Sequence, residues 1–112
     1  MTKTLRRIDD GRIVCERCKL AVTFWTKFRG LMGHASLPAD EGMLFRPAGS
    51  IHMFFMRFPI DVVFCDDELR VVKVVRDLKP WRMAAARGAK VTIELAVGVA
   101  SGLEPGIALR LD

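Results

Sequence analysis

Two apolar segments separated by a proline constrain this fold more than any other feature of the sequence. Residues 51–56 and 60–65 are rich in aromatic and β-branched side chains, and Pro59 lies between them. Short apolar runs of this composition are typical of strands that are covered on both faces. We therefore predict two adjacent strands in the centre of an antiparallel sheet.

Further segments with a strand-like composition lie on both sides of this pair. They are residues 12–15, 19–22, 42–45, 69–76, 91–97 and 107–111. Residues 24–32 differ, because their apolar side chains recur with helical spacing between Thr23, a possible N-cap, and Gly33, a possible C-cap. These elements predict an α+β, β-rich fold: a single compact antiparallel sheet, partly closed and barrel-like, with one main helix packed on it.

The chain length and composition predict one domain that can bury a core. The 112 residues are 51% hydrophobic and 28% charged, as in folded domains and unlike disordered chains. We take residues 1–112 as a single domain and residues 1–10 as a loose basic N-terminal arm. No apolar run reaches the roughly 20 residues of a membrane helix, and the polar start lacks the apolar region of a signal peptide. We expect a cytoplasmic protein with no membrane partner.

Several short motifs, taken in order, carry a resemblance to a known bacterial family. They are Gly30-Leu31-Met32-Gly33, Gly42-Met43-Leu44-Phe45, Phe54-Phe55-Met56 and Pro59-Ile60-Asp61-Val62-Val63-Phe64, followed by Glu94-Leu95 and Gly106. Over about residues 18–111 the chain resembles the Domain of Unknown Function 192 family. The resemblance implies a compact β-rich domain and implies no reaction. The chain departs from the family pattern at Arg57-Phe58-Pro59, where many members have Lys-Asn-Thr, and at Gly106-Ile107, where Gly-Asp is usual.

Charged side chains inside the apolar strands mark a candidate functional site. Asp61 and Glu94 lie in separate apolar runs, and a buried carboxylate costs roughly several kcal/mol unless it is paired. Upstream of Asp61, Arg57 can pair with a carboxylate and His52 can exchange a proton near neutral pH. We predict a ligand-binding site formed by His52, Met56, Arg57, Asp61 and Glu94. The alternative is structural: Asp61 holds a turn through backbone N–H groups, and Glu94 pairs with an arginine.

The three cysteines predict free thiols. An odd number, Cys15, Cys18 and Cys65, fits a reducing compartment. Cys15-Glu16-Arg17-Cys18 is one C-x-x-C pair, which supplies only two of the four ligands of a structural zinc site. The other Cys and His residues do not stand at ligand spacing. We expect no metal and no cofactor, with a metal or redox role of the pair as the alternative.

Basic residues cluster in two blocks that flank an acidic middle. The net charge is +5, and residues 70–90 hold seven Lys or Arg against one Asp. Such blocks can attract nucleic acid or form a solvated basic face. A single tryptophan, Trp81, is a poor platform for stacking bases, so nucleic acid is a disfavoured partner.

These observations favour a non-enzymatic binding module for a small ligand or peptide in the His52–Asp61 region. The second hypothesis is a small acid/base enzyme, a hydrolase or isomerase, that uses Asp61 and Glu94 as a carboxylate pair; both carboxyls must then face one cleft. The third is nucleic-acid binding through residues 70–90. For the oligomeric state we consider a monomer or a weak dimer.

Overall fold

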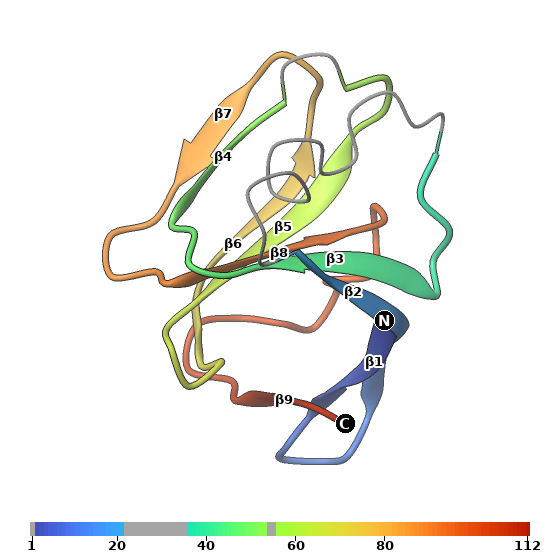
Figure 1. Cartoon of the computed structure of the whole chain (residues 1–112), viewed down its shortest axis with the longest axis vertical. Coiled ribbons are helices and arrows are strands. Elements are labelled where there is room, and N and C mark those ends of the chain that lie inside the picture. The colour runs from blue at the N-terminus through green and yellow to red at the C-terminus, as the bar shows by residue number, and fades with distance from the viewer. Residues whose placement is uncertain (1, 22–35, 54–55) are drawn as a thin grey trace.

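The computed structural model describes residues 2–21, 36–53 and 56–112. The strands are β1 (Thr2–Arg7), β2 (Ile13–Ala21), β3 (Glu41–Phe45), β4 (Ser50–His52), β5 (Ile60–Cys65), β6 (Val71–Leu78), β7 (Met83–Ala85), β8 (Val91–Leu95) and β9 (Leu109–Leu111). Seven of them form one sheet in the order β6-β5-β8-β3-β2-β1-β9, and β4 and β7 form a separate two-stranded sheet (Figure 1).

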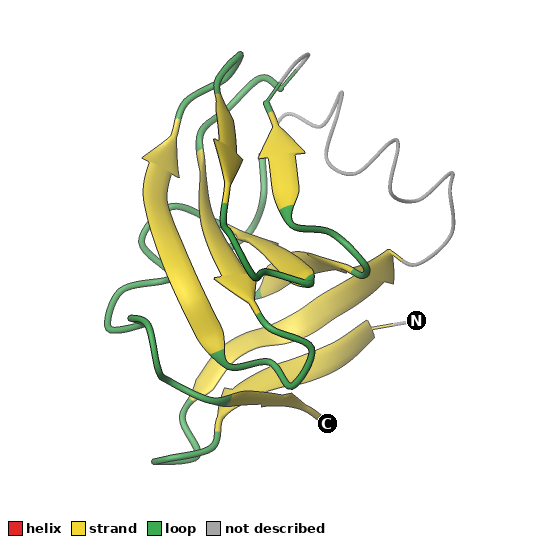
Figure 2. Cartoon of the chain, turned by 90° about the vertical axis from the view of Figure 1, so that its left-hand side faces the viewer, coloured by secondary structure: helices red, strands yellow, loops and turns green. Residues whose placement is uncertain are grey.

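The fold over these residues is all-β, so the predicted α+β class is wrong. Strands, turns and loops account for the whole described part of the chain, without a helix (Figure 2). The helix predicted at residues 24–32 lies outside the described residues. The described residues also contain no helix that is long and apolar enough to cross a membrane.

The large sheet is neither closed nor purely antiparallel, contrary to the sequence prediction. Its edge strands are β6 and β9, and one isolated bridge, between Arg70 and Ala108, links the chain near these edges. The pair β2–β3 is parallel. Residues 22–40 connect these two strands, and a connection of this length is sufficient for the crossover that parallel pairing requires. The spacing of apolar residues alone does not distinguish parallel from antiparallel pairing of strands.

Residues 2–7 are a strand and not part of a loose arm. Strand β1 pairs with β2 on one edge and with β9 on the other. Leu5 is buried in the core, and Arg6 forms an ion pair with Asp112 at 2.9 Å. Polar side chains suit this strand because they are exposed or half-buried, while the backbone is paired on both edges.

Only the second of the two predicted central strands lies where we expected it. Residues 60–65 form β5, which lies between β6 and β8 with all six residues buried. Val63 and Phe64 are inaccessible to solvent, as predicted. In the described part of the first predicted segment, residues 51 and 52 belong to β4, which pairs with β7 instead of β5. The predicted burial of Phe55 lies outside the described residues.

Strand alternation divides the core into two clusters on opposite faces of the large sheet. The first, the leucine cluster, includes Leu44 of β3, Val63 of β5 and Ile93 of β8, which lie across from one another. The second, the methionine cluster, contains Ala21, Met43, Phe45, Met53, Met56, Ile60, Val62, Phe64 and Leu78. Side chains on β3, β5 and β8 therefore lie on the face of one cluster or the other according to their position in the strand.

Gly42 lies at a close contact between β2, β3 and β8. An added Cβ would stand 2.9 Å from Cδ2 of Leu95, 3.0 Å from the Glu94 carbonyl oxygen and 3.1 Å from Sγ of Cys15. The carbonyl belongs to a central strand and cannot yield easily. We expect Gly42→Ala to lower the free energy of unfolding by about 1–3 kcal/mol through overpacking. Urea unfolding measures this change, and an unaltered midpoint would show that the sheet can spread at this position.

Candidate functional site

Backbone N–H groups hold the buried carboxylate of Asp61. The residue is 1% exposed. Asp77 N–H donates to Oδ1 at 2.9 Å, and the N–H groups of Gly98 and Ala100 donate to Oδ2 at 2.9 and 3.1 Å. The carboxylate thus joins the end of β6 to the loop that follows β8. This arrangement is the structural alternative for Asp61, and Arg57 is not one of its hydrogen-bond partners among the described residues.

Glu94 is buried on β8 without such compensation. It is 5% exposed, and its Oε1 atom has no hydrogen-bond partner among the described residues. Its cross-strand neighbours, Met43 of β3 and Val62 of β5, are apolar. Burial raises the pKa of the Glu94 carboxyl from its ordinary 4.5 to about 8, so it is largely protonated at neutral pH. Glu94 is therefore a neutral acid with unused capacity for hydrogen bonding.

Asp61 and Glu94 point to opposite faces of the sheet. In the β5–β8 register Asp61 lies across from Leu95, and Glu94 lies across from Val62. Residues directly opposite one another share a face, and successive residues alternate. Asp61 therefore lies on the face of the leucine cluster and Glu94 on the face of the methionine cluster. These two carboxyls cannot line one cleft as a carboxylate pair.

The other predicted site residues are also separated. His52 is exposed on β4, across from Met83 of β7. Arg57 is exposed in the turn before β5. Met56 is buried in the methionine cluster, on the side of the sheet that Glu94 faces. Of the five residues, Met56 and Glu94 lie on the face of the methionine cluster, Asp61 lies on the opposite face, and His52 and Arg57 are exposed.

A hollow of about 250 Å³ lies on the methionine-cluster face of the sheet, and Met43, the cross-strand neighbour of Glu94, is part of its lining. It is lined by Thr2, Arg17, Lys19, Ser36, Leu37, Pro38, Glu41, Gly42 and Met43. Thr2, Lys19, Met43 and Glu94 form one cross-strand row through β1, β2, β3 and β8. The Met43 side chain, itself part of the lining, therefore stands next to Glu94 in this row.

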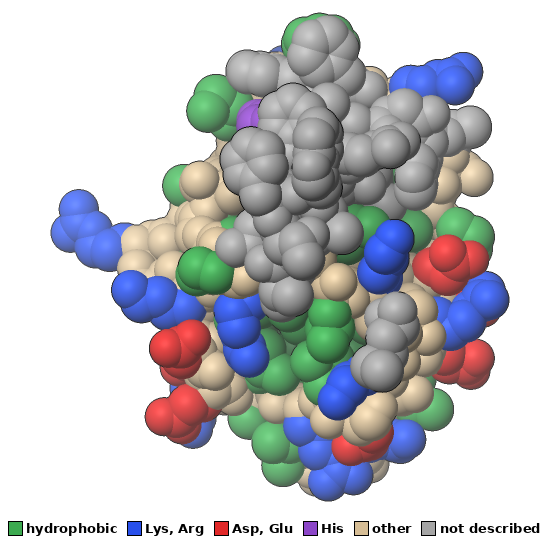
Figure 3. Space-filling view, viewed as in Figure 1, with side chains coloured by type: hydrophobic (Ala, Val, Ile, Leu, Met, Phe, Trp, Pro, Cys, Tyr) green, Lys and Arg blue, Asp and Glu red, His purple; other side chains and the backbone are tan. Residues whose placement is uncertain are grey.

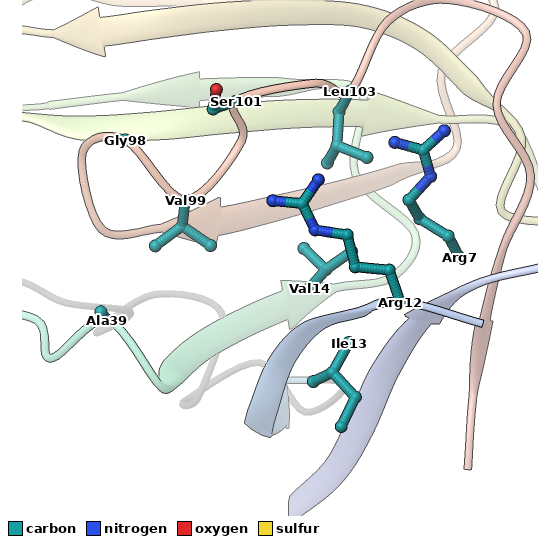
Figure 4. A pocket seen from close by; sticks show the side chains of 9 residues that line it. All are labelled: Arg7, Arg12, Ile13, Val14, Ala39, Gly98, Val99, Ser101 and Leu103. Atoms are coloured by element: carbon teal, nitrogen blue, oxygen red, sulfur yellow. The ribbon is translucent and has the colours of Figure 1, made fainter. Parts of the chain in front are cut away.

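A second hollow, of about 210 Å³, lies between the start of β2 and the loop after β8 (Figure 4). Its lining residues are Arg7, Arg12, Ile13, Val14, Ala39, Gly98, Val99, Ser101 and Leu103. Our reading of the sequence missed this hollow, because its walls come from segments far apart in the chain. The only sequence signal was the basic character of the N-terminal residues.

The C-x-x-C cysteines are buried free thiols on β2. An irregularity in the β1–β2 register turns both Cys15 and Cys18 into the leucine cluster. A hydrogen bond with the Cys18 side chain lowers the pKa of the Cys15 thiol, whereas that contact and burial raise the pKa of Cys18. Burial raises the pKa of Cys65 to about 12. Within the described ranges, no three His, Cys, Asp or Glu side chains are grouped to hold a metal ion.

Part of the positive charge in residues 70–90 is bound within the protein. Lys73 and Arg76 donate to backbone carbonyl oxygens, and Lys79 forms an ion pair with Asp77 at 2.7 Å. On the face shown in Figure 3, Lys and Arg side chains are interspersed with Asp and Glu side chains instead of forming one continuous basic surface.

The fold and the two hollows define a small protein with an open, mixed β-sheet and a buried neutral acid on the same face as one hollow. The chain belongs to the DUF192 family, because the model of that family (Uncharacterized ACR) matches residues 6–111. The resemblance noted in the sequence is thereby confirmed.

Two similar proteins come from species of Thermococcus. A UPF0127 protein of Thermococcus sibiricus is 39% identical over 111 residues, which cover 91% of this chain and 69% of that protein. A UPF0127 protein of Thermococcus kodakarensis is 41% identical over 97 residues, and the match covers 79% of this chain and 59% of that protein.

Two crystal structures share the fold. A protein of unknown function from Novosphingobium aromaticivorans has a TM-score of 0.82 at 24% identity, over 98% of this chain and 84% of that chain. A Sinorhizobium meliloti protein, described as a "putative transcription regulator", has a TM-score of 0.87 at 23% identity, over 99% and 94% of the two chains. At these identities the likeness concerns the fold alone.

Proposed function

We propose that this protein is a non-enzymatic binding module that takes a small ligand or a peptide side chain beside Glu94, on the face of the methionine cluster. The unpartnered, buried Oε1 atom of Glu94 carries the proposal. Buried polar atoms in proteins nearly always have a hydrogen-bond partner, and each exception requires an explanation. A bound ligand that supplies the missing partner is such an explanation, and the hollow of about 250 Å³ that the neighbouring Met43 lines offers it space.

The residues around the hollow suggest the chemistry of the ligand. Leu37 and Met43 provide apolar contacts, and Lys19 has no ion-pair partner among the residues the structure describes. The thioether of Met43 is flexible, so a rotamer change there can open a path from the hollow to Glu94. A ligand with an apolar body and a hydrogen-bond acceptor for the protonated Glu94 carboxyl matches this site.

The surroundings of Glu94 favour binding over acid/base catalysis. A carboxylate-pair mechanism requires both carboxyls at one cleft, whereas Asp61 faces the other side of the sheet and is committed to three backbone N–H groups. The cross-strand neighbours of Glu94 are Met43 and Val62, which cannot transfer protons. Glu94 is thus suited to hold a ligand by hydrogen bonding.

A ligand screen combined with one isosteric substitution tests the proposal. We expect compounds found by a thermal-shift screen of metabolites and short apolar peptides to bind Glu94→Met about tenfold more weakly than the unaltered protein. The loss corresponds to one hydrogen bond, about 1.4 kcal/mol. Isothermal titration calorimetry measures the affinities, and the melting temperature verifies that the variant folds.

Glu16→Gln is the control, because Glu16 is exposed on β2 and its substitution should leave the affinity unchanged. Compounds that bind Glu94→Met and the unaltered protein equally well would contradict a ligand site at Glu94.

A further inference from the structure

We propose that the second hollow, between Arg7 and Arg12, is a binding site for a small oxyanion, the phosphate or carboxylate group of a small molecule. The hollow of about 210 Å³ lies between the start of β2 and the loop of residues 96–103. It involves none of the residues proposed to bind a ligand beside Glu94. The two sites can therefore be tested separately.

The two guanidinium groups converge over Gly102. The Nη1 atoms of Arg7 and Arg12 each lie 3.7 Å from the point where a Cβ on Gly102 would stand. Figure 4 shows both side chains extending toward the loop that closes the hollow. Because Gly102 has no side chain, the space between its Cα and the two guanidinium groups stays open. Planar guanidinium groups with several N–H donors bind oxyanions through paired hydrogen bonds.

The charges of the two arginines are compensated unequally. Arg7 binds both carboxylate oxygens of Asp9, at 3.0 and 2.7 Å, and lies 3.7 Å from Asp10. Its Nη1 atom donates to the Gly102 carbonyl oxygen at 3.3 Å. The Arg12 guanidinium has no ion pair or hydrogen bond among the described residues; its hydrogen bonds are those of its backbone, from its N–H to Asp10 at 2.9 Å and from the Arg7 N–H to its carbonyl oxygen at 2.9 Å. Arg12 therefore supplies the uncompensated charge, and Arg7 supplies a fixed second donor.

The wall of the hollow is held in place before any ligand binds. Asp61 accepts hydrogen bonds from the N–H groups of Gly98 and Ala100. Arg76 donates to the carbonyl oxygens of Ala100 and Leu103, at 3.3 and 2.7 Å. Donors and walls that are already in position lose little entropy on binding, which favours affinity. By holding this loop, the buried Asp61 carboxylate also helps to fix the shape of the proposed site.

Titration with inorganic phosphate and with acetate, each at constant ionic strength, tests the proposal. We expect saturable shifts of the amide resonances of residues 98–103 in ¹⁵N-resolved NMR spectra of the intact protein. Arg12→Gln should weaken binding about tenfold or more, since a hydrogen-bonded charge is lost. Arg87→Gln makes the same change of charge in an exposed turn away from the hollow, and we expect it to bind like the unaltered protein. Melting temperatures of both variants verify that they fold.

The two probes distinguish the sources of the oxyanion. Saturation by phosphate alone identifies a phosphate site, and saturation by acetate alone identifies a carboxylate site; either result supports the proposal. Linear shifts that do not saturate, or equal responses of the unaltered protein and Arg12→Gln, would overturn it. An equal loss in Arg12→Gln and Arg87→Gln would also overturn it, because only the overall charge would then matter.

Discussion

Replacement of Glu94 by glutamine should abolish most of the pH dependence of stability between about pH 5 and pH 8. The pKa of the Glu94 carboxyl is raised by burial from 4.5 to about 8 in the folded protein. Between these two values the folded chain holds a proton that the unfolded chain has released. The free energy of unfolding therefore falls as the pH rises, by about 1.4 kcal/mol per pH unit. Glutamine has no proton to lose, so this slope should disappear.

Urea unfolding at pH 5 and pH 9 measures the effect. Near pH 5 both proteins carry a neutral side chain, and we expect similar stabilities. At pH 9 we expect Glu94→Gln to be more stable by about a few kcal/mol, since it avoids burying a charge. The control Glu16→Gln, on the exposed side of β2, should keep the slope of the unaltered protein. If the free energy of unfolding varied with pH in the same way in all three proteins, Glu94 would ionise without a loss of stability, contrary to this prediction.

Asp61→Asn should destabilise the fold by about 2–4 kcal/mol. The carboxylate accepts three backbone hydrogen bonds through its two oxygens. An asparagine side chain keeps one acceptor oxygen and presents an N–H₂ group to the remaining donors, which leaves buried N–H groups unsatisfied. Hydrogen bonds to charged groups contribute about 1.5–3 kcal/mol each. Chemical denaturation measures the loss, and hydrogen exchange should become faster at the amides of Gly98 and Ala100.

Asp66→Asn is a matched control for this prediction. The Oδ1 atom of Asp66 accepts the N–H groups of Glu68 and Arg70, both at 2.9 Å, in a surface turn. Water can replace these bonds, so we expect a smaller loss of stability, below about 1 kcal/mol. Equal effects of the two substitutions, or an unchanged melting temperature for Asp61→Asn, would contradict the structural role of Asp61.

The strands that sequence patterns predicted best are those buried on both faces. Residues 42–45, 60–65 and 91–97 were predicted as strands, and β3, β5 and β8 cover most of these positions. A continuous apolar run bounded by turn residues indicates such a strand without knowledge of its partners. Strand β1 has no such run, and it is a strand because β2 and β9, from opposite ends of the chain, pair with it.

The same contrast, between what a local sequence pattern predicts and what the tertiary structure decides, holds for single residues of the candidate site. The sequence by itself determined that Asp61 and Glu94 are carboxyls within apolar strands, and both are buried. The cost of burying such a group is a local property, so the pattern was sufficient to single them out. Their partners depended on tertiary structure: segments distant in sequence bring three N–H groups to Asp61 and leave Oε1 of Glu94 unpartnered among the described residues.

The faces on which these carboxyls lie were also decided only by the tertiary structure. In the register of β5 against β8, Asp61 lies across from Leu95 and Glu94 across from Val62. A shift of one residue in either strand would turn its side chains to the other face. That register depends on the packing of the whole sheet, and no local pattern in either strand specifies it. The same holds for the two hollows, whose walls join β1, β2 and β3 to loops elsewhere in the chain.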